Sequence, residues 1–172
     1  MIARRFASVG FACLVLGAFQ LEAPNFPNGC HAVEIEIDEE TGKVAIIDYC
    51  VVDDVGHVIN PLTLKGQIKG GIAQGVGQAL MENIAYDPDS GQLLSGSFMD
   101  YCMPRADDLS CIKIESNPVP TETNPLGVKG AGEAGTVGAL PCMMSAIADA
   151  DKFSQARAAM LDELQQFKDA LP

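Results

Sequence analysis

Lys129-Gly130-Ala131-Gly132-Glu133-Ala134-Gly135 is the stretch that decides how this 172-residue chain folds and what chemistry it can carry. Its glycines leave Glu133 without a bulky neighbour, so the backbone can bring this carboxylate close to a large ligand. The apolar run that follows is typical of a helix. Two interpretations of Glu133 stay open: a carboxylate stabilised at a helix N-terminus by up to ~1 kcal/mol, and a general base.

Alternating apolar and acidic residues upstream predict a β-hairpin. The alternation runs from His31 to Asp38, residues 39–42 supply a turn, and Lys43 to Val52 forms the partner strand. Residues 53–61 are predicted as a loop, because Asp, Gly and an Asn before Pro are unfavourable inside strands and helices.

Two further β segments are predicted downstream. Residues 92–101 form a strand or an extended segment, residues 104–108 a polar loop, and residues 111–116 a short strand. Together with the helices, these segments predict an α+β fold of β-hairpins and helices.

The strongest helical pattern covers residues 62–85, where apolar residues recur every four positions. Glycines lie beside this stripe and cost about 1 kcal/mol each in helix propensity. Either they allow another backbone to approach, or they let a polar ligand reach the neighbouring glutamines, of which Gln67 and Gln74 are examples. We expect the glycines to break the segment into a loop and a shorter helix.

The chain divides into three parts by composition. Residues 1–21 are apolar behind Arg4 and Arg5, which is compatible with an export signal, a buried helix or a stretch foreign to the domain. Residues 22–150 form the main domain, with a small-residue helix over 136–150. Residues 151–172 predict an amphipathic helix that packs on this domain or on a partner.

Charge and motif content exclude several function classes. Acidic residues outnumber basic ones 23 to 11, which argues against a nucleic-acid partner and favours a cytoplasmic protein. The uncharged N-terminal run is too short for a membrane span. The glycine-rich stretches lack the phosphate-loop and dinucleotide fingerprints.

The six cysteines are spread singly, without zinc or iron–sulfur spacing, so we expect reduced thiols, with disulfides as the alternative. His31 and His57 are predicted to be isolated surface histidines.

Five motifs resemble a known family in order and spacing. They are Asn28-Gly29-Cys30-His31, Asp53-Asp54-x-Gly56-x-x-x-Asn60-Pro61, Gly66-Gln67-x-x-Gly70-Gly71-x-Ala73-Gln74-Gly75, Gly96-Ser97-Phe98-Met99-Asp100-Tyr101, and Asn124-Pro125-x-Gly127-x-Lys129-Gly130-x-Gly132-Glu133-Ala134-Gly135. Together they resemble the C-terminal molybdenum-cofactor-binding half of the large subunit of molybdenum hydroxylases, the xanthine dehydrogenase and aldehyde oxidase family. The carbon monoxide dehydrogenase type is the most similar, and the resemblance covers residues 22–148.

The resemblance implies roles for individual residues. Glu133 corresponds to the base that takes a proton from a molybdenum-bound hydroxyl, while the remaining site residues contact the cofactor. Those cofactor-binding residues are Gln74 and Gly75, Asp54, Gly56 and Asn60 toward the dinucleotide end, and Lys129 and Gly130. No residue of this chain is expected to bind the metal directly.

The resemblance also implies a cofactor and partners. The cofactor is molybdenum-molybdopterin, in its cytosine dinucleotide form, shared with the missing part of the large subunit. The partners are that remaining half, iron–sulfur and flavin subunits, and a small-molecule substrate. Because family large subunits are several times longer, we expect a chain that is inactive alone. The alternative is a truncated, non-catalytic fragment that acts as an interaction or orphan module.

Overall fold

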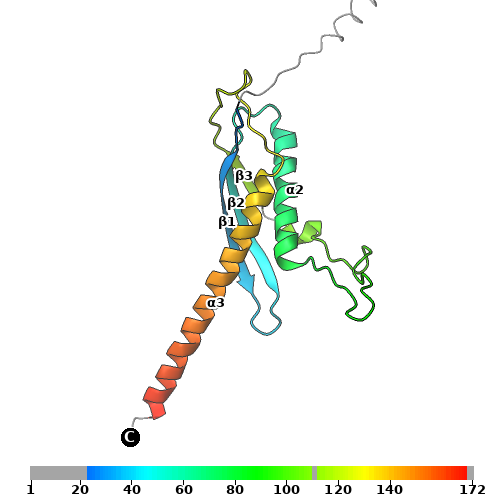
Figure 1. Ribbon diagram of the computed structural model, residues 1–172. Helices are drawn as coiled ribbons and strands as arrows, with labels where there is room; N and C mark the ends of the chain where they lie inside the picture. The colour runs from blue at the N-terminus through cyan, green and yellow to red at the C-terminus, as the bar shows by residue number, and fades with distance from the viewer. Residues whose placement is uncertain (1–22, 110–111, 170–172) are drawn as a thin grey trace, which may run out of the picture.

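The computed structural model describes residues 23–109 and 112–169, and Figure 1 shows a small sheet beside two helices. The elements in chain order are β1 (Asn28–Ile37), β2 (Val44–Asp54), α2 (Pro61–Leu80), the short 3-10 helix η1 (Ala106–Leu109), β3 (Ile112–Ser116) and α3 (Ala134–Asp169). This arrangement confirms the predicted α+β fold. The atypical stretch 1–21 lies outside the described residues.

The predicted hairpin is confirmed. β1 and β2 pair antiparallel from Asn28 opposite Asp54 to Ile37 opposite Val44, with one register shift between Glu34 and Ile35. At the turn, Asp38 accepts hydrogen bonds from the backbone of Glu40 and Thr41, and Gly42 adopts a φ of 71°. Glycine reaches this conformation without strain, which explains its place in the turn.

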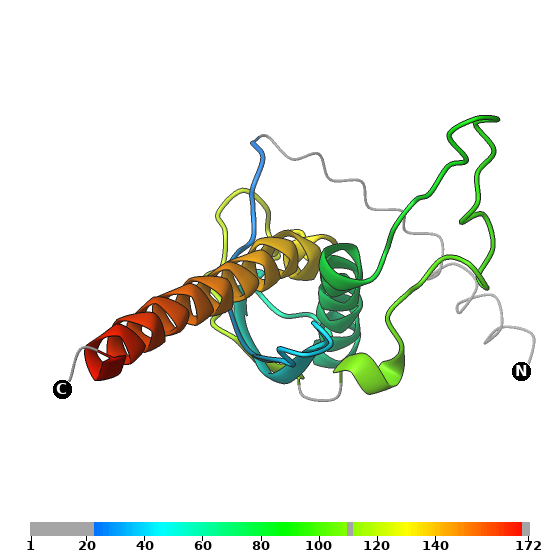
Figure 2. The same ribbon diagram turned by 90° about the horizontal axis from the view of Figure 1, so that it is seen from below.

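β3 joins the sheet at the other edge of β2 and runs parallel to it, so the strand order is β1-β2-β3. The short strand predicted over residues 111–116 is therefore confirmed, over residues 112–116. A strand or an extended segment was predicted over residues 92–101, and the strand does not form there, because the only pairing is an isolated bridge between Tyr86 and Leu93. We call residues 82–105 the arm; Figures 1 and 2 show it extending away from the sheet and helices.

α2 is one uninterrupted helix, so the predicted break at its glycines is wrong. Asn60 caps its start by accepting hydrogen bonds from the backbone of Leu62 and Thr63. The glycines are compensated by packing: a Cβ at Gly75 would lie 2.6 Å from the Cβ of Ala139 on α3. Of the two explanations that the sequence left open, close helix packing accounts for Gly75.

α3 is a single helix of 36 residues, which contains Pro141 and runs through the predicted boundary at residue 150. Two separate helices were predicted over this stretch, and the helix continues between them. Its C-terminal part extends beyond the sheet (Figures 1 and 2). Phe153, Met160 and Leu161 are 74%, 57% and 51% exposed, so these side chains do not pack on the described domain.

Both helices pack on one face of the sheet and bury a small core. Alternate residues of β2 point toward the helices, among them Tyr49, Val51 and Asp53, whereas Ile47 and Val52 on the opposite face are 45% and 44% exposed. The fully buried apolar residues are Tyr49, Val51, Ile68, Ile72, Val76, Ala139 and Met143. Burying an aliphatic side chain of this size stabilises a fold by roughly 1.5–3 kcal/mol, so this set holds α2, α3 and the sheet together.

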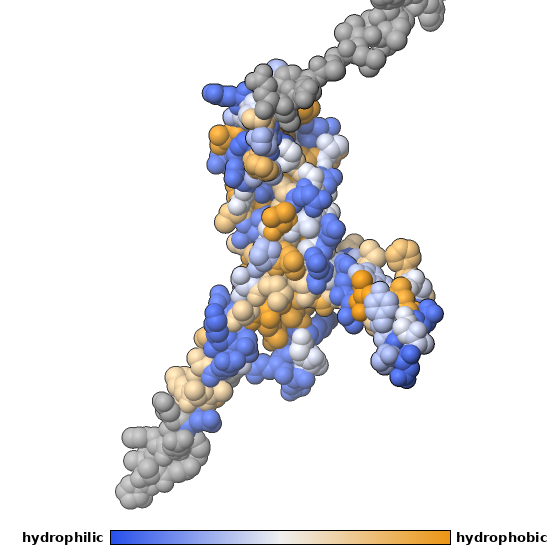
Figure 3. All heavy atoms as spheres, in the orientation of Figure 1, coloured by the Kyte–Doolittle hydropathy of each residue, from blue (hydrophilic) through white to orange (hydrophobic). Residues whose placement is uncertain are grey.

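Large apolar side chains remain exposed on the arm. They include Ile84, Tyr86, Leu94, Phe98 and Met99, and Phe98 and Met99 are 88% and 93% exposed. The space-filling view shows hydrophobic patches on this part of the chain (Figure 3). Within residues 23–109 and 112–169, no helix has the length and apolar character needed to cross a membrane.

Candidate functional site

Glu133 lies where the glycine-rich stretch enters α3. Its carbonyl accepts a hydrogen bond from the amide of Val137, so Glu133 immediately precedes α3, at the N-cap position. The residue is exposed and borders a cavity of about 530 Å³. A Cβ added at Gly130 or Gly132 would have no atom within 4 Å other than those of the residues next to it in sequence. The backbone beside Glu133 is therefore open to a ligand.

Glutamines of α2 fix the glycine-rich stretch. Gln67 donates a hydrogen bond of 2.8 Å from Nε2 to the carbonyl of Gly132, next to Glu133. One turn further along α3, Thr136 Oγ1 donates to Gln74 Oε1 at 3.2 Å. The polar side of α2 therefore holds the segment that carries Glu133.

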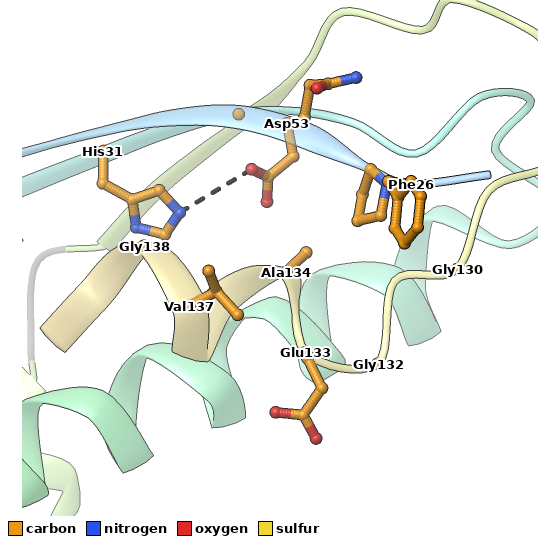
Figure 4. Close-up of a pocket in the computed structure, with 12 residues that line it drawn as sticks. Phe26, His31, Asp53, Gly130, Gly132, Glu133, Ala134, Val137 and Gly138 are labelled. Atoms are coloured by element: carbon orange, nitrogen blue, oxygen red, sulfur yellow. Dashed lines mark ion pairs between the residues drawn. The ribbon is translucent and has the colours of Figure 1, made fainter. Parts of the chain in front are cut away.

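The opposite wall of this cavity is formed by β1 and β2, and it contains a buried acid. Asp53 is 1% exposed, and its Oδ2 atom has no hydrogen-bond partner. Its Oδ1 atom lies 3.8 Å from Nε2 of His31, whose side chain is only 5% exposed. Figure 4 shows His31 and Asp53 on one side of the cavity, and the carboxylate of Glu133, which also lines the cavity, directed away from this pair.

Tyr49 lies on the far side of His31, with 2.7 Å between its hydroxyl and Nδ1. Burial raises the pKa of Tyr49 well above its usual value, and burial lowers the pKa of His31 against the opposing effect of Asp53. Tyr49 therefore keeps its proton at neutral pH and can donate it to Nδ1. When Tyr49 is the donor, the ring proton of neutral His31 lies on Nε2, toward Asp53.

The prediction that His31 is an isolated surface histidine is wrong. His31 lies directly across from Val51 in the hairpin register, so it shares the inward face of the sheet with Tyr49 and Asp53. The period-two pattern could have identified this cluster, because residues 49, 51 and 53 alternate on one face. Asp53 was missed because an acid at the end of a strand was assigned to the following loop.

A second group brings together three of the predicted cofactor residues. Lys129 Nζ donates to Asp54 Oδ2 at 2.5 Å, and both side chains are nearly buried. The backbone amides of Gly56 and Val119 both donate to Asp54 Oδ1 at 2.9 Å. Burial raises the pKa of Asp54, but the hydrogen bonds from Lys129, Val119 and Gly56 outweigh it and lower the pKa to about 2.

The contacts of Asp54, Gly56 and Lys129 hold the loop between β2 and α2 against the segment that precedes Glu133. Gly56 has a φ of 67°, and a Cβ there would lie 2.2 Å from the carbonyl oxygen of Gly127. The amide of Lys129 donates to the carbonyl of Val55 at 2.8 Å. Asn60 and Lys129 border a second cavity of about 490 Å³, which also includes Gln67 and Gly132.

The predicted cofactor residues thus fall in three places. Asp54, Gly56 and Lys129 form one connected group, Asn60 caps α2, and Gly130 borders the cavity beside Glu133. Gln74 and Gly75 lie further along α2, and neither lines these two cavities. Gly75 faces α3 at the point of closest helix packing.

The site fits a large, flat organic ligand better than a bare ion. Among the described residues, no group of three His, Cys, Asp or Glu side chains is placed to hold a metal ion. The first amides of α3 have no acceptor within the helix, which makes its start suited to an anionic group. Phe26, Ala134 and Val137 give the 530 Å³ cavity apolar walls.

Comparisons with known proteins agree with this geometry. A family model described as "Molybdopterin cofactor-binding domain" matches residues 17–110. The large subunit of nicotine 6-hydroxylase from Paenarthrobacter nicotinovorans is 39% identical over 77% of this chain and 16% of its own length. The carbon monoxide dehydrogenase large chain from Afipia carboxidovorans is 34% identical over 78% of this chain and 17% of its own length.

Solved structures give the same result. Carbon monoxide dehydrogenase from Oligotropha carboxidovorans matches with a TM-score of 0.70 and 34% identity, over 74% of this chain and 16% of that one. Quinoline 2-oxidoreductase from Pseudomonas putida 86 matches with a TM-score of 0.65 and 40% identity, over 68% of this chain and 15% of that one.

The chain spans about one sixth of the length of these relatives. Sequence and fold nevertheless agree on one assignment. This chain belongs to the molybdopterin cofactor-binding domain family, as found in the large subunits of molybdenum hydroxylases.

Proposed function

We propose that this chain contributes one wall of a molybdenum-molybdopterin site in a hydroxylase or dehydrogenase large subunit, with Glu133 as the general base. The observation that carries the proposal is the position of Glu133, between uncovered glycine backbone and a cavity of about 530 Å³. A base must come within hydrogen-bond reach of the proton that it removes, and this backbone leaves room for that approach.

The Glu133 carboxylate is available to act. Among residues 23–109 and 112–169, it has no hydrogen-bond or ion-pair partner, while its backbone is held through the Gln67 contact to Gly132. A free carboxylate on a fixed backbone can accept the proton of the water-derived oxygen nucleophile without first losing another partner.

When bound, the cofactor would supply a Lewis-acidic centre that also accepts two electrons. The exposed backbone at Gly130 and the first amides of α3 would bind anionic or polar groups of this cofactor. The group formed by Asp54, Gly56 and Lys129 would support the dinucleotide end, for which we propose the cytosine form. Gln74 and Gly75 would support the cofactor site indirectly, because they hold α3 against α2.

The relatives support a small organic molecule as substrate. Nicotine 6-hydroxylase and quinoline 2-oxidoreductase are named for nitrogen-containing aromatic rings. We propose that this chain acts in the cytoplasm with the remaining part of the large subunit and with iron–sulfur and flavin subunits. The exposed apolar side chains of the arm and of the C-terminal part of α3 are surfaces that such partners could cover.

A second function rests on that same exposure. Phe153, Met160 and Leu161 on α3 have no contact that buries them in the described chain. Under this alternative, the chain is a non-catalytic fragment that acts only as an interaction or orphan module.

Co-expression with the neighbouring genes and purification of the resulting complex would separate the two functions. The enzyme function predicts stoichiometric molybdenum and pterin. Glu133→Gln should then keep both and lose turnover by at least about 100-fold, in the range expected for general-base catalysis. Glu36→Gln, at an exposed position of β1, is the matched control and should retain turnover. A metal-free and pterin-free complex would support the fragment function.

A further inference from the structure

The C-terminal part of α3 carries apolar side chains that the described residues leave largely uncovered. We call residues 151–169 the tail, and Figures 1 and 2 show it projecting away from the sheet and from α2. Phe153 and Met160 are 74% and 57% exposed, and Ala156 between them is exposed as well. A helix of this length without a packing partner is only marginally stable in water. We therefore expect the tail to pack on another surface.

The apolar positions of the tail form a stripe that is symmetric about Met160. Successive positions are separated by three, four, four and three residues, so the spacing is the same in both directions along the chain. Residues with this spacing share one face of a helix. The five positions are Phe153, Ala156, Met160, Leu164 and Phe167.

This symmetry matches the tail to an antiparallel copy of itself. With Met160 opposite its own copy, position 153 lies opposite position 167, and position 156 lies opposite position 164. Phenylalanine then meets phenylalanine at each end of the stripe, and the small alanine faces a leucine. An interface between two identical copies about a two-fold axis requires such a self-complementary surface, whereas an unrelated partner requires no symmetry.

The charges of the chain also favour pairing through the tail. Residues 151–169 include four acidic and three basic residues, so the tail contributes −1 to the net charge of −12. The rest of the chain is therefore strongly acidic and repels a second copy. In the antiparallel arrangement, the points where the two tails leave their domains lie about 30 Å apart, which is several Debye lengths at physiological ionic strength. Parallel tails would bring the two acidic domains side by side.

We propose that the tail is an interface for a second copy of this chain, with two α3 helices packed antiparallel about Met160. The inference goes beyond the proposed function and does not depend on it. Residues 151–169 lie outside the stretch 22–148 that resembles the hydroxylase family, and they do not line the cavity beside Glu133.

Sedimentation equilibrium of the purified full chain, over a dilution series, tests the proposal. We expect a reversible monomer–dimer equilibrium, with a species of twice the 18.1 kDa chain mass. The Kd should be on the order of micromolar, as for a small interface. The helical circular dichroism signal should rise as the dimer forms, because the tail then gains its packing partner.

A substitution at the centre of the stripe should disrupt the dimer. Met160→Glu should raise Kd by at least about 30-fold, because it removes a central apolar contact from both copies and brings two carboxylates together. Ala158→Glu is the matched control, since it adds the same charge about 200° around the helix from Met160. It should change Kd by less than about twofold. Thermal unfolding of each variant checks that the domain stays folded.

A mixing experiment tests the register of the two helices. Phe153→Glu and Phe167→Lys should each dimerise weakly on their own. An equal mixture of the two variants should dimerise at least about tenfold more tightly, because the introduced charges then lie opposite each other. Phe153→Glu mixed with Phe153→Lys is the control for a parallel pair and should show no such recovery.

Several results would overturn the inference. A chain that is monomeric at every concentration would do so, as would a dimer that Met160→Glu leaves unchanged. A monomer whose tail is needed for co-purification with the remaining part of the large subunit would assign the tail to that partner instead. Recovery in the parallel control alone would exclude the antiparallel register. None of these results affects the Glu133→Gln turnover test, because that test concerns a different part of the chain.

Discussion

Gly135 of α3 lies against the carbonyl of Ile68 on α2, so closely that a Cβ at Gly135 would be 2.3 Å from that oxygen. Gly71 and Gly75 also approach α3 closely, since a Cβ there would lie 2.8 Å from the amide nitrogen of Thr136 and 2.6 Å from the Cβ of Ala139. The contact lies two residues after Glu133. The position of the proposed base is therefore set by how closely the two helices pack.

Gly135→Ala should lower the free energy of unfolding by about 1–3 kcal/mol, because the added methyl group forces the helices apart. Urea denaturation monitored by circular dichroism measures this loss. Gly70→Ala is the control, since nothing lies within 4 Å of its added Cβ. It should raise stability by up to about 1 kcal/mol through helix propensity. Equal effects at both positions would contradict the close-packing explanation.

Asn60→Ala should destabilise the chain by about 1 kcal/mol, because the first amides of α2 lose their side-chain acceptor. Asn60→Asp keeps that acceptor and should retain nearly full stability. Urea denaturation of both variants checks the prediction. If Asn60→Asp were as unstable as Asn60→Ala, the capping role would be excluded.

Lys129→Met should lower stability at pH 7 by about 1–3 kcal/mol, since it leaves the nearly buried Asp54 without its cation. Lys113→Met removes the partner of Asp48, but the Lys113 side chain is 67% exposed. The effect there should stay below about 1 kcal/mol. Equal losses of stability in the two variants would contradict the prediction that the nearly buried Asp54 and Lys129 pair stabilises the fold more than an exposed pair.

The Asp54 carboxyl should also make the free energy of unfolding fall at acidic pH. Its folded pKa of about 2 lies below the ordinary value of 3.8, so its contribution is present above pH 3.8 and is lost as pH falls toward 2. We expect a loss on the order of 1 kcal/mol after solvent screening. Asp54→Asn, compared with the unmodified chain from pH 6 to pH 2, should lack this component.

Asp53 should have the opposite pH dependence. Burial raises its pKa, against the effect of His31, so the group destabilises the fold increasingly as pH rises from 3.8 through its folded pKa. Asp53→Asn should be more stable than the unmodified chain at pH 7, on the order of 1 kcal/mol. The difference should vanish below pH 3.8. His31 and Tyr49 face this group, so a His31→Asn background isolates the Asp53 contribution.

Local sequence patterns predicted the elements whose partners are close in the chain. Period-two alternation identified the hairpin of β1 and β2, and the turn at Gly42 followed from residue type. The break predicted in α2 was wrong because helix propensity counts only local cost, whereas Gly75 is compensated by Ala139, 64 positions away in the sequence.

The candidate site was predicted unevenly for the same reason. The glycines around Glu133 marked that residue as special, and the structure places it beside a cavity. The pairing of Lys129 with Asp54 joins residues far apart in sequence, and no local pattern predicts it. Asp53 was predicted in a loop and His31 on the surface. Their contact was missed because it depends on the register of two strands.

The parallel pairing of β2 with β3 has a practical consequence for the arm. Parallel neighbours require a crossover, and here the crossover already includes α2 and the arm, so its length is loosely constrained. Doubling a flexible connection adds only ~0.6 kcal/mol of closure entropy. Gly91, at the exposed tip of a turn with open space around it, is therefore a suitable place to insert a purification or labelling peptide.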